Sequence, residues 1–289
     1  MNYTIKSELL TVTVSDLGAE LKSVLSKDGH EYIWGADERY WAGSAPILFP
    51  LCGRILDNKY TVLGNEYSMK IHGFARKCVF DVTEHSESTI TLRLTESEAT
   101  LLEYPFNFEL MAKYAVSGNT LDVSFTVKNT NDKELPYMLG WHPGFNLEGT
   151  NAINSFNLEF EGKKSFTVYP LQNGGFVRPY GEEYFIENER LPLNEDELRD
   201  TGTLIFVGTG DKTRLCSPEA PHAVDFSWSA NLPYFCLWKA ESSDARYICL
   251  EPWSDVPADG VTPENFDTRK MSRLGSGEQE EYCYNIKFF

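Results

Sequence analysis

The sequence lacks the features of several large protein classes. None of its apolar runs approaches the ~20 residues of a membrane span, and no leading apolar segment indicates a signal peptide, so we expect a cytoplasmic protein. Basic residues are scarce: 26 Lys and Arg stand against 43 Asp and Glu, a formal net charge of -17. Nucleic acids and anionic membranes attract basic surfaces, so neither is expected as a partner.

Nucleotide and hydrolase motifs are also missing. The chain has no P-loop, no GxGxxG strand–helix turn, no HExxH and no GxSxG elbow, so we expect no cofactor. Its six cysteines show no CxxC pairing and are predicted to be buried free thiols of a reducing compartment. A metal site of His72, His142 and Glu251 has acceptable ligand types, but no tight ligand spacing supports it. We therefore predict no metal.

Hydrophobic residues alternate with polar ones along most of the chain. A period of two is typical of strands with one buried face, and it is clearest at 10–14, 90–94, 121–127, 156–160 and 282–288. Helical periodicity is not sustained anywhere, and short helical turns fit only at 96–103 and 195–200. We predict an all-β fold, a large antiparallel β-sandwich, with residues 1–289 forming a single domain.

Two short strings carry the strongest chemical signal. Trp141-His142-Pro143-Gly144 offers an imidazole beside a proline, which restricts the backbone before it and so fixes the direction of the side chain. Leu250-Glu251-Pro252-Trp253 ends an apolar strand with a carboxylate, and burial there would raise its pKa and suit it to act as a base. A core histidine and an edge salt bridge are the simpler alternatives. Together the two side chains could form an acid–base pair.

Further candidates lie in loops rich in proline and glycine. His72 precedes Gly73, which lets a ligand or backbone come close to the imidazole. Arg54 ends an apolar loop, and its planar guanidinium suits vicinal hydroxyls. Arg76, together with Lys70 and Lys77, forms the basic cluster near His72 and could hold a phosphate.

Aromatic residues gather in the same loops. Sugar rings present C–H faces that stack on aromatic side chains. Four aromatic residues of these loops could make this contact, although structural packing would explain any one of them equally well: Trp34, Trp41, Phe145 and Trp253. Structural packing is the expectation for Trp228 and Trp238, which lie within strand-like runs.

At these residues the chain resembles the aldose 1-epimerase, or galactose mutarotase, family. It is most similar to the compact bacterial branch, which includes proteins found with lactose-utilisation enzymes. The matching strings follow the family order and span nearly the whole chain. They are Gly18–Ser23, Trp41–Pro50 with Gly53-Arg54, His72–Arg76, Tyr104–Phe108, Gly140–Asn146 and Leu250–Trp253.

The resemblance implies a galactose mutarotase-like β-supersandwich and a role for each matched residue. It implies that His142 protonates the ring oxygen of a sugar and that Glu251 removes the proton of the C1 hydroxyl. It implies that His72 and Arg54 bind the sugar. Better-known members also bind it through an aspartate, for which the local match is poor; the candidates are Asp200 and, as a rival, Asp225.

The resulting hypothesis is an aldose 1-epimerase that interconverts the anomers of a free hexose. The reaction needs one proton in and one proton out, and an ionised Glu251 would raise the pKa of a neighbouring His142. Two alternatives stay open: a hexose-6-phosphate mutarotase, and a sugar-binding or sugar-sensing protein without turnover. Neither the sugar nor the choice between monomer and homodimer follows from the sequence.

Overall fold

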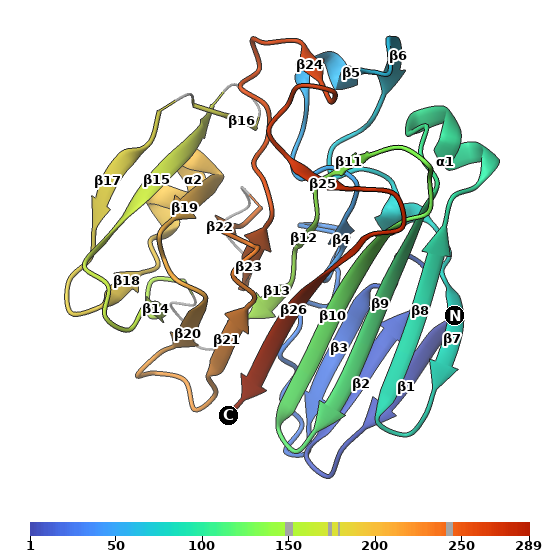
Figure 1. Cartoon of the computed structure of the whole chain (residues 1–289). Coiled ribbons are helices and arrows are strands. Elements are labelled where there is room, and N and C mark those ends of the chain that lie inside the picture. Colours follow the sequence, from blue (N-terminus) through green and yellow to red (C-terminus); the bar gives the residue numbers. More distant parts are fainter. Residues whose placement is uncertain (148–152, 173–174, 179, 241–244) are drawn as a thin grey trace.

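Two large antiparallel sheets make up most of the protein. The computed structural model describes residues 1–147, 153–172, 175–178, 180–240 and 245–289, without the side chains of 172 and 199–201. Each large sheet has nine strands, counting two that branch from the main path of the second (Figure 1). The predicted all-β fold and antiparallel β-sandwich are confirmed.

The first sheet contains most of the strands that alternation predicts. In β10, Leu121, Val123, Phe125 and Val127 are buried and their neighbours are more exposed. In spatial order this sheet consists of β18 (Arg190–Pro192), β14 (Asn157–Glu159), β20 (Lys212–Cys216), β21 (Val224–Trp228), β26 (Gln279–Phe288), β10 (Thr120–Asn129), β9 (Phe108–Ser117), β8 (Thr89–Thr95) and β7 (Asp81–His85).

The second sheet carries the residues of the candidate site. Its path runs β16 (Phe176–Val177), β15 (Ser165–Gln172), β19 (Thr203–Val207), β22 (Tyr234–Trp238), β23 (Tyr247–Trp253), β12 (Gly140–Trp141) and β4 (Ile47–Leu48). Off this path, β13 (Gly144–Asn146) pairs with β23, and β17 (Glu182–Phe185) pairs with β15.

Aromatic side chains fill the space between the two sheets. Trp141 of the second sheet is fully buried and meets three rings of the first, with centroid distances of 5.9 Å to Phe125, 6.2 Å to Phe226 and 5.1 Å to Tyr284. Because side chains alternate across a strand, the residue after Trp141 is directed away from this core. The packing of Trp141 therefore positions His142 on the outer face of the second sheet.

Smaller elements surround the sandwich. They are the sheet of β1 (Asn2–Lys6), β2 (Leu10–Ser15) and β3 (Leu21–Ser26), the pair β11 (Leu135–Tyr137) and β25 (Ser272–Leu274), the sheet of β24 (Glu264–Asn265), β5 (Lys59–Val62) and β6 (Asn65–Ser68), the helices α1 (Glu98–Glu103) and α2 (Glu195–Thr201), and the 3-10 turns η1 (Leu56–Asn58) and η2 (Ala75–Lys77). Both helices lie where short helical turns fit the sequence.

Two further expectations can be compared with the structure. All six cysteines are free; Cys52, Cys236 and Cys249 are buried as predicted, whereas Cys283 is exposed. Within the described ranges, no helix is long and apolar enough to cross a membrane.

Candidate active site

Strand β23 presents Glu251 on the face that points away from the sandwich core. Ile248 and Leu250 belong to the main core, whereas Tyr247 and Cys249 pack in a separate aromatic cluster on the other side of the strand. Glu251 follows Cys249 by two residues and so shares its face. Alternation of side chains along a strand predicts this division. The Glu251 side chain is nevertheless fully buried.

His142 meets Glu251 from the connection between β12 and β13. Its backbone N–H donates to the Pro46 carbonyl over 3.1 Å, and its Nε2 lies 3.3 Å from Oε2 of Glu251. The imidazole is packed between two indoles, 4.8 Å from Trp41 and 5.1 Å from Trp238 between ring centroids. The two strings that the sequence singles out are thus brought into contact.

The surroundings of this pair disfavour charge. Burial raises the pKa of Glu251 well above its usual value, and the nearby Trp253 indole only partly offsets the shift. Burial lowers the pKa of His142 to about 3. We expected an ionised Glu251 to raise the pKa of His142, and this expectation is wrong for this site, because burial disfavours the charged forms of both groups.

Neither partner is otherwise satisfied within the described parts of the chain. Both carboxylate oxygens of Glu251 and Nδ1 of His142 are buried without a hydrogen-bond partner there. Buried polar atoms in folded proteins nearly always have a partner. Unsatisfied atoms that converge in this way are expected of a site that closes around a polar ligand.

His72 stands beside the pair in a strained backbone. Its φ is +65°, an uncommon value for a residue with a side chain, and Gly73 follows at +66°. Nδ1 of His72 accepts a hydrogen bond from the Gly53 N–H over 3.1 Å, so the proton of the neutral ring lies on Nε2. The His72 ring is 5.6 Å from His142 and 5.9 Å from Trp253. Burial lowers the pKa of His72 well below its usual value.

Gly73 is required by the backbone that approaches it. A Cβ on Gly73 would come within 2.2 Å of the Phe49 carbonyl oxygen, and the two residues form an isolated parallel bridge. The sequence predicts a close approach of a ligand or backbone at Gly73, and the structure shows backbone. This contact fixes His72 against the segment that leads to Arg54.

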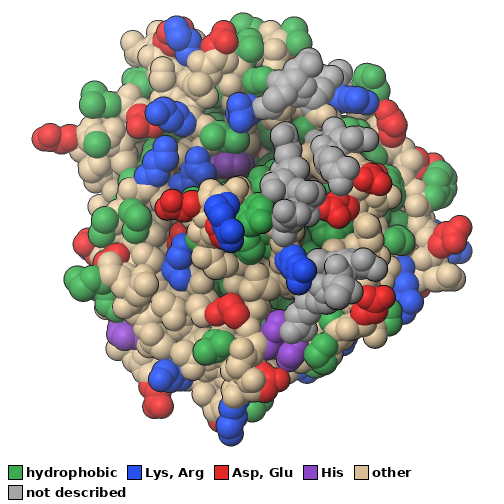
Figure 2. Space-filling model, turned by 180° about the vertical axis from the view of Figure 1, so that it is seen from behind, with side chains coloured by type: hydrophobic (Ala, Val, Ile, Leu, Met, Phe, Trp, Pro, Cys, Tyr) green, Lys and Arg blue, Asp and Glu red, His purple; other side chains and the backbone are tan. Residues whose placement is uncertain are grey.

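Two half-buried arginines flank the histidines. Arg54 and Arg76 each have a buried Nε without a hydrogen-bond partner among the described residues. Their charges help to lower the pKa of His72, and Arg76 also acts on His142. The Arg76 head is held by one bond from Nη2 to the Ile71 carbonyl. Figure 2 shows a recess that contains a histidine side chain and is bordered by hydrophobic, Lys and Arg side chains.

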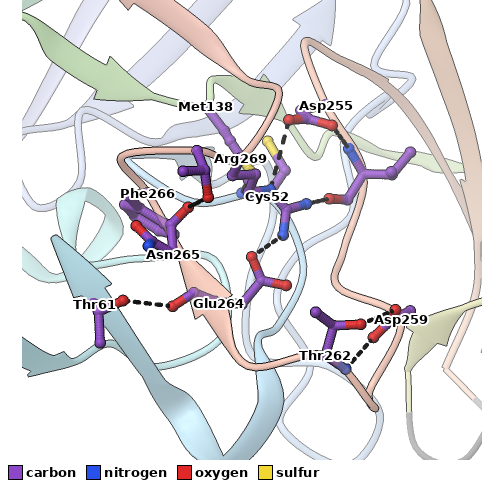
Figure 3. A network of polar contacts seen from close by, with 12 residues as sticks. Cys52, Thr61, Met138, Asp255, Asp259, Thr262, Glu264, Asn265, Phe266 and Arg269 are labelled. Atoms are coloured by element: carbon purple, nitrogen blue, oxygen red, sulfur yellow. Dashed lines mark hydrogen bonds and ion pairs between the residues drawn. The ribbon is translucent and has the colours of Figure 1, made fainter.

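A buried ion-pair network fixes the loop that follows β23. Figure 3 shows Arg269 between Asp255 and Glu264. Arg269 forms a close ion pair with Glu264, lies 3.9 Å from Asp255 and donates to the Val256 carbonyl over 2.6 Å. The same loop reaches the arginine segment, because the Ala258 N–H donates to the Arg54 carbonyl over 3.0 Å. The network thereby connects the Glu251 strand to Arg54.

The structure places the candidate aromatic residues in different surroundings. Trp41 and Trp253 lie in the site; a Cβ on Gly140 would come within 2.5 Å of the Trp253 ring, so this glycine makes room for it. Phe145 does not contribute, because it is fully buried between the sheets, 5.9 Å from Phe226. Trp238, which we predicted to be structural, contacts His142, because it lies on the same face of β22 as the partner of Glu251, Cys236.

The two candidate aspartates give different outcomes. Asp200 lies in α2, but its side chain is outside the described residues. Asp225 forms an ion pair with Arg214 over 2.8 Å and lines a groove of about 570 Å³ on the outer face of the first sheet. Because it faces away from the sandwich core, Asp225 is separated from Glu251 by both sheets. The structure therefore removes Asp225 as a sugar ligand of this site.

Metal-ligand atoms also gather at the pair. One group of this kind is His142, Cys249 and Glu251, whose ligand atoms lie within 4.8 Å of one another. It differs from the set considered from the sequence, because Cys249 takes the place of His72, whose Nδ1 is engaged by Gly53.

Comparison with known proteins identifies the family of this chain. The family model for aldose 1-epimerase matches residues 1–263. The chain belongs to the aldose 1-epimerase family. The chromosomal protein LacX of Lactococcus lactis subsp. lactis is 32% identical over 270 residues, which cover 89% of this chain and 88% of LacX. The resemblance inferred from the ordered strings is thereby confirmed.

Solved structures of this family superimpose over the full chain. A galactose mutarotase-like protein from Lactobacillus casei has a TM-score of 0.93 and 29% identity and covers 100% of both chains. A galactose mutarotase related enzyme from Lactobacillus acidophilus has a TM-score of 0.92 and 27% identity, covering 100% of this chain and 97% of its own. The chain thus has a galactose mutarotase-like fold and belongs to a family of sugar epimerases.

Proposed function

We propose that the protein is an aldose 1-epimerase that interconverts the α and β anomers of a hexose. The observation that carries this proposal is the contact of His142 and Glu251, 3.3 Å apart and buried on the outer face of the second sheet. Anomer exchange requires an acid for the ring oxygen and a base for the C1 hydroxyl. An imidazole and a carboxylate within reach of one sugar supply both.

The pair carries one proton through the whole reaction. In the empty site that proton resides on Glu251, because burial disfavours both charged forms. Sugar hydroxyls that bond to the unsatisfied Glu251 oxygens stabilise the carboxylate, and the proton moves to His142. His142 then protonates the ring oxygen while Glu251 accepts the C1 hydroxyl proton. The C1–O bond opens to the aldehyde, C1 rotates, and closure from the other face returns both protons.

The remaining side chains suit the recognition of a sugar. Arg54 brings a guanidinium with a buried, unsatisfied Nε, and neutral His72 can donate from Nε2 because its Nδ1 is occupied. The indoles of Trp41, Trp238 and Trp253 offer faces or edges to sugar C–H groups. This combination of directional donors and aromatic rings is typical of carbohydrate sites.

A second candidate substrate is a hexose 6-phosphate. Two arginines, Arg54 and Arg76, favour this substrate. The charges of both lower the pKa of His72, and neither arginine forms an ion pair within the described parts of the chain. Unpaired arginines at a site are unusual in a chain with a net charge of -17 and suit an anion. We favour the neutral sugar because Arg76 is held by a backbone carbonyl and an acidic surface repels a dianion.

Exchange of anomers measured by NMR would test this proposal. Several hexoses and their 6-phosphates are compared at equilibrium with the protein, with the Glu251→Gln variant and with buffer alone. Acceleration by the protein, absent from the variant, is expected for at least one hexose. Acceleration confined to 6-phosphates would favour the second candidate. If the protein binds a sugar but accelerates anomer exchange of none, the proposed enzymatic activity is wrong and a sensing protein is indicated.

A further inference from the structure

Three kinds of metal ligand converge beside the sugar site. Cys249 and Glu251 point the same way from β23, two residues apart, and His142 meets them from the β12–β13 connection. The thiol sulfur, an imidazole nitrogen and a carboxylate oxygen all lie within 4.8 Å of one another. Neither acid–base catalysis nor sugar binding requires the Cys249 thiol.

The spacing suits a tetrahedral ion. Zinc–nitrogen and zinc–oxygen bonds of about 2.0–2.2 Å place two such ligands about 3.4 Å apart in a tetrahedron. The observed separation of His142 Nε2 and Glu251 Oε2 is 3.3 Å. A sulfur at about 2.3 Å from the ion would lie about 3.6 Å from each of the other ligands. A movement of about 1 Å would bring Cys249 from the observed limit of 4.8 Å to that distance.

The ligand atoms are also free to bind. Both oxygens of Glu251 are buried and have no hydrogen-bond partner within the described ranges. Cys249 is a free thiol with no exposed surface. A thiolate, a carboxylate and a neutral imidazole would together balance the charge of a divalent ion. Ions of this type prefer sulfur and nitrogen donors, whereas Mg²⁺ prefers oxygen alone.

We propose that His142, Cys249 and Glu251 form a three-ligand site for Zn²⁺ or a similar thiophilic divalent cation. Such an ion occupies the acid and the base at once, so it acts as a competitive inhibitor and not as a cofactor. The inhibition rests on the function proposed above. The binding site itself does not, because it depends only on the three ligands.

Binding can be tested without any measurement of activity. Chelator-treated, desalted protein is titrated with Co²⁺, a spectroscopic substitute for Zn²⁺, and with Zn²⁺ by calorimetry. We expect one ion per site, tetrahedral visible bands and a thiolate-to-metal band in the near ultraviolet. Cys249→Ser should abolish the thiolate band and weaken Zn²⁺ binding at least about tenfold. Titration with Mg²⁺ should give no binding.

Two controls separate this site from other ligands. Cys236→Ser removes a buried thiol opposite Glu251 on β22 that lies outside the group. His222→Gln removes the imidazole that contacts Asp28 at the surface. Both should keep the spectrum, and circular dichroism should show that every variant is folded. An unchanged thiolate band in Cys249→Ser, or its loss in Cys236→Ser, would overturn the proposal. His142→Gln should also weaken binding, and it decides the case if Cys249→Ser does not fold.

Inhibition is tested last. Zn²⁺ should raise the apparent KM of anomer exchange and leave kcat unchanged, and Cys249→Ser should shift the inhibition constant at least about tenfold. If the protein accelerates no anomer exchange but shows the thiolate band, the site stands and the proposed function fails. If exchange is fast and no ion binds, the function stands and the metal site is wrong.

Discussion

Nε2 of His142 lies 3.3 Å from Oε2 of Glu251, and the two side chains are 8% and 0% exposed. At this depth the pair holds a single proton more easily than two separated charges. The position of that proton depends on what else fills the site. In the mechanism that we propose, a sugar that bonds to the carboxylate shifts the proton to the imidazole, which is the arrangement that ring opening requires.

Removal of either member of the pair should abolish most of the turnover. Positioned acids and bases each contribute about 10²–10⁴-fold, so Glu251→Gln and His142→Asn should each lower kcat at least about a hundredfold. Sugar binding, measured by calorimetry, should survive because both replacements keep hydrogen-bonding groups. Glu280→Gln is the matched control, since Glu280 lies in β26 of the first sheet and accepts hydrogen bonds from Tyr137 of β11 and from Tyr282. Near wild-type rates in either site variant would refute the assignment.

The pH dependence of turnover should report the coupled pair. The productive state contains one proton, so activity falls when a second proton binds and when the last one leaves. Because the pKa of His142 is about 3, the acid limb of kcat/KM should lie well below pH 6.5, and the basic limb should lie above the usual range of a carboxylate. Circular dichroism at each pH separates these limbs from unfolding. An acid limb near pH 6.5 would mean that the imidazole is solvated.

Burial of Glu251 should cost stability as the pH rises. Burial raises its pKa in the folded protein above the ordinary value of 4.5, so the carboxyl contributes stability that is present below pH 4.5 and lost above it. The loss amounts to about 1.4 kcal/mol per pH unit until the folded pKa is reached. Glu251→Gln has no such loss and should become more stable than the wild type as pH increases, which urea unfolding at several pH values measures.

Glu280 provides a control of opposite sign for this stability test. Burial alone would raise its pKa, but hydrogen bonds from Asn231, Tyr137 and Tyr282 outweigh burial and lower it. Its contribution to stability is therefore present above pH 4.5 and lost as the pH falls. Glu280→Gln should thus become less stable than the wild type as pH rises. A parallel trend in both variants would show that the effect is not specific to Glu251.

Local pattern was sufficient to predict the fold and to single out two side chains, His142 and Glu251, that the structure brings into contact. Alternation reports which face of a strand is buried, so it separated Ile248 and Leu250 from Glu251. Alternation failed where the position of a side chain depends on which element packs against that face of the strand. Phe145 shares a glycine-rich string with His142, but strand pairing with Ile248 directs its ring into the core. Trp238 ends an apolar run that is typical of a core strand, yet its ring contacts His142 in the candidate site.

The electrostatics of the site also could not be predicted from the sequence. A glutamate beside a histidine suggests mutual stabilisation of charge, and only the depth of both groups reveals that desolvation dominates. The Arg269 network was equally hidden, because its partners Asp255 and Glu264 are brought together by a loop that no periodicity describes. Cys249 gave no signal either, since a cysteine in an apolar strand usually serves only packing.

Arg269 should act on the site through the loop that it holds. Removal of one partner from a buried ion pair destabilises a protein by about 3–5 kcal/mol, and Glu264 and Asp255 are only 9% and 8% exposed. Arg269→Gln should lower the melting temperature and, through the bond of Ala258 to the Arg54 carbonyl, raise KM more than it lowers kcat. Arg269→Lys should recover part of both effects.

The Arg214–Asp225 pair is a suitable comparison for Arg269. It lies near the solvent on the first sheet, with the two side chains 39% and 42% exposed. Surface ion pairs contribute about 0–1 kcal/mol, so Arg214→Gln should change stability little and KM not at all. A rise in KM in this variant, or none in Arg269→Gln, would show that Arg269 does not position the sugar site.

Arg76 distinguishes a neutral sugar from a sugar phosphate. Burial lowers its pKa and its Nη2 donates to the Ile71 carbonyl over 3.0 Å, so its first role is to hold the loop that contains His72. For a neutral sugar, Arg76→Ala should lower the melting temperature but leave the affinity for hexoses nearly unchanged, and added salt should have little effect. For a phosphate, the same change removes a charge-assisted bond of about 1.5–3 kcal/mol, and affinity should fall as salt rises.

The exposed Lys70 is the matched control, because Lys70→Ala removes a nearby charge without disturbing that loop. We expect the neutral outcome; a large loss of affinity confined to 6-phosphates in Arg76→Ala, and not in Lys70→Ala, would reverse our preference.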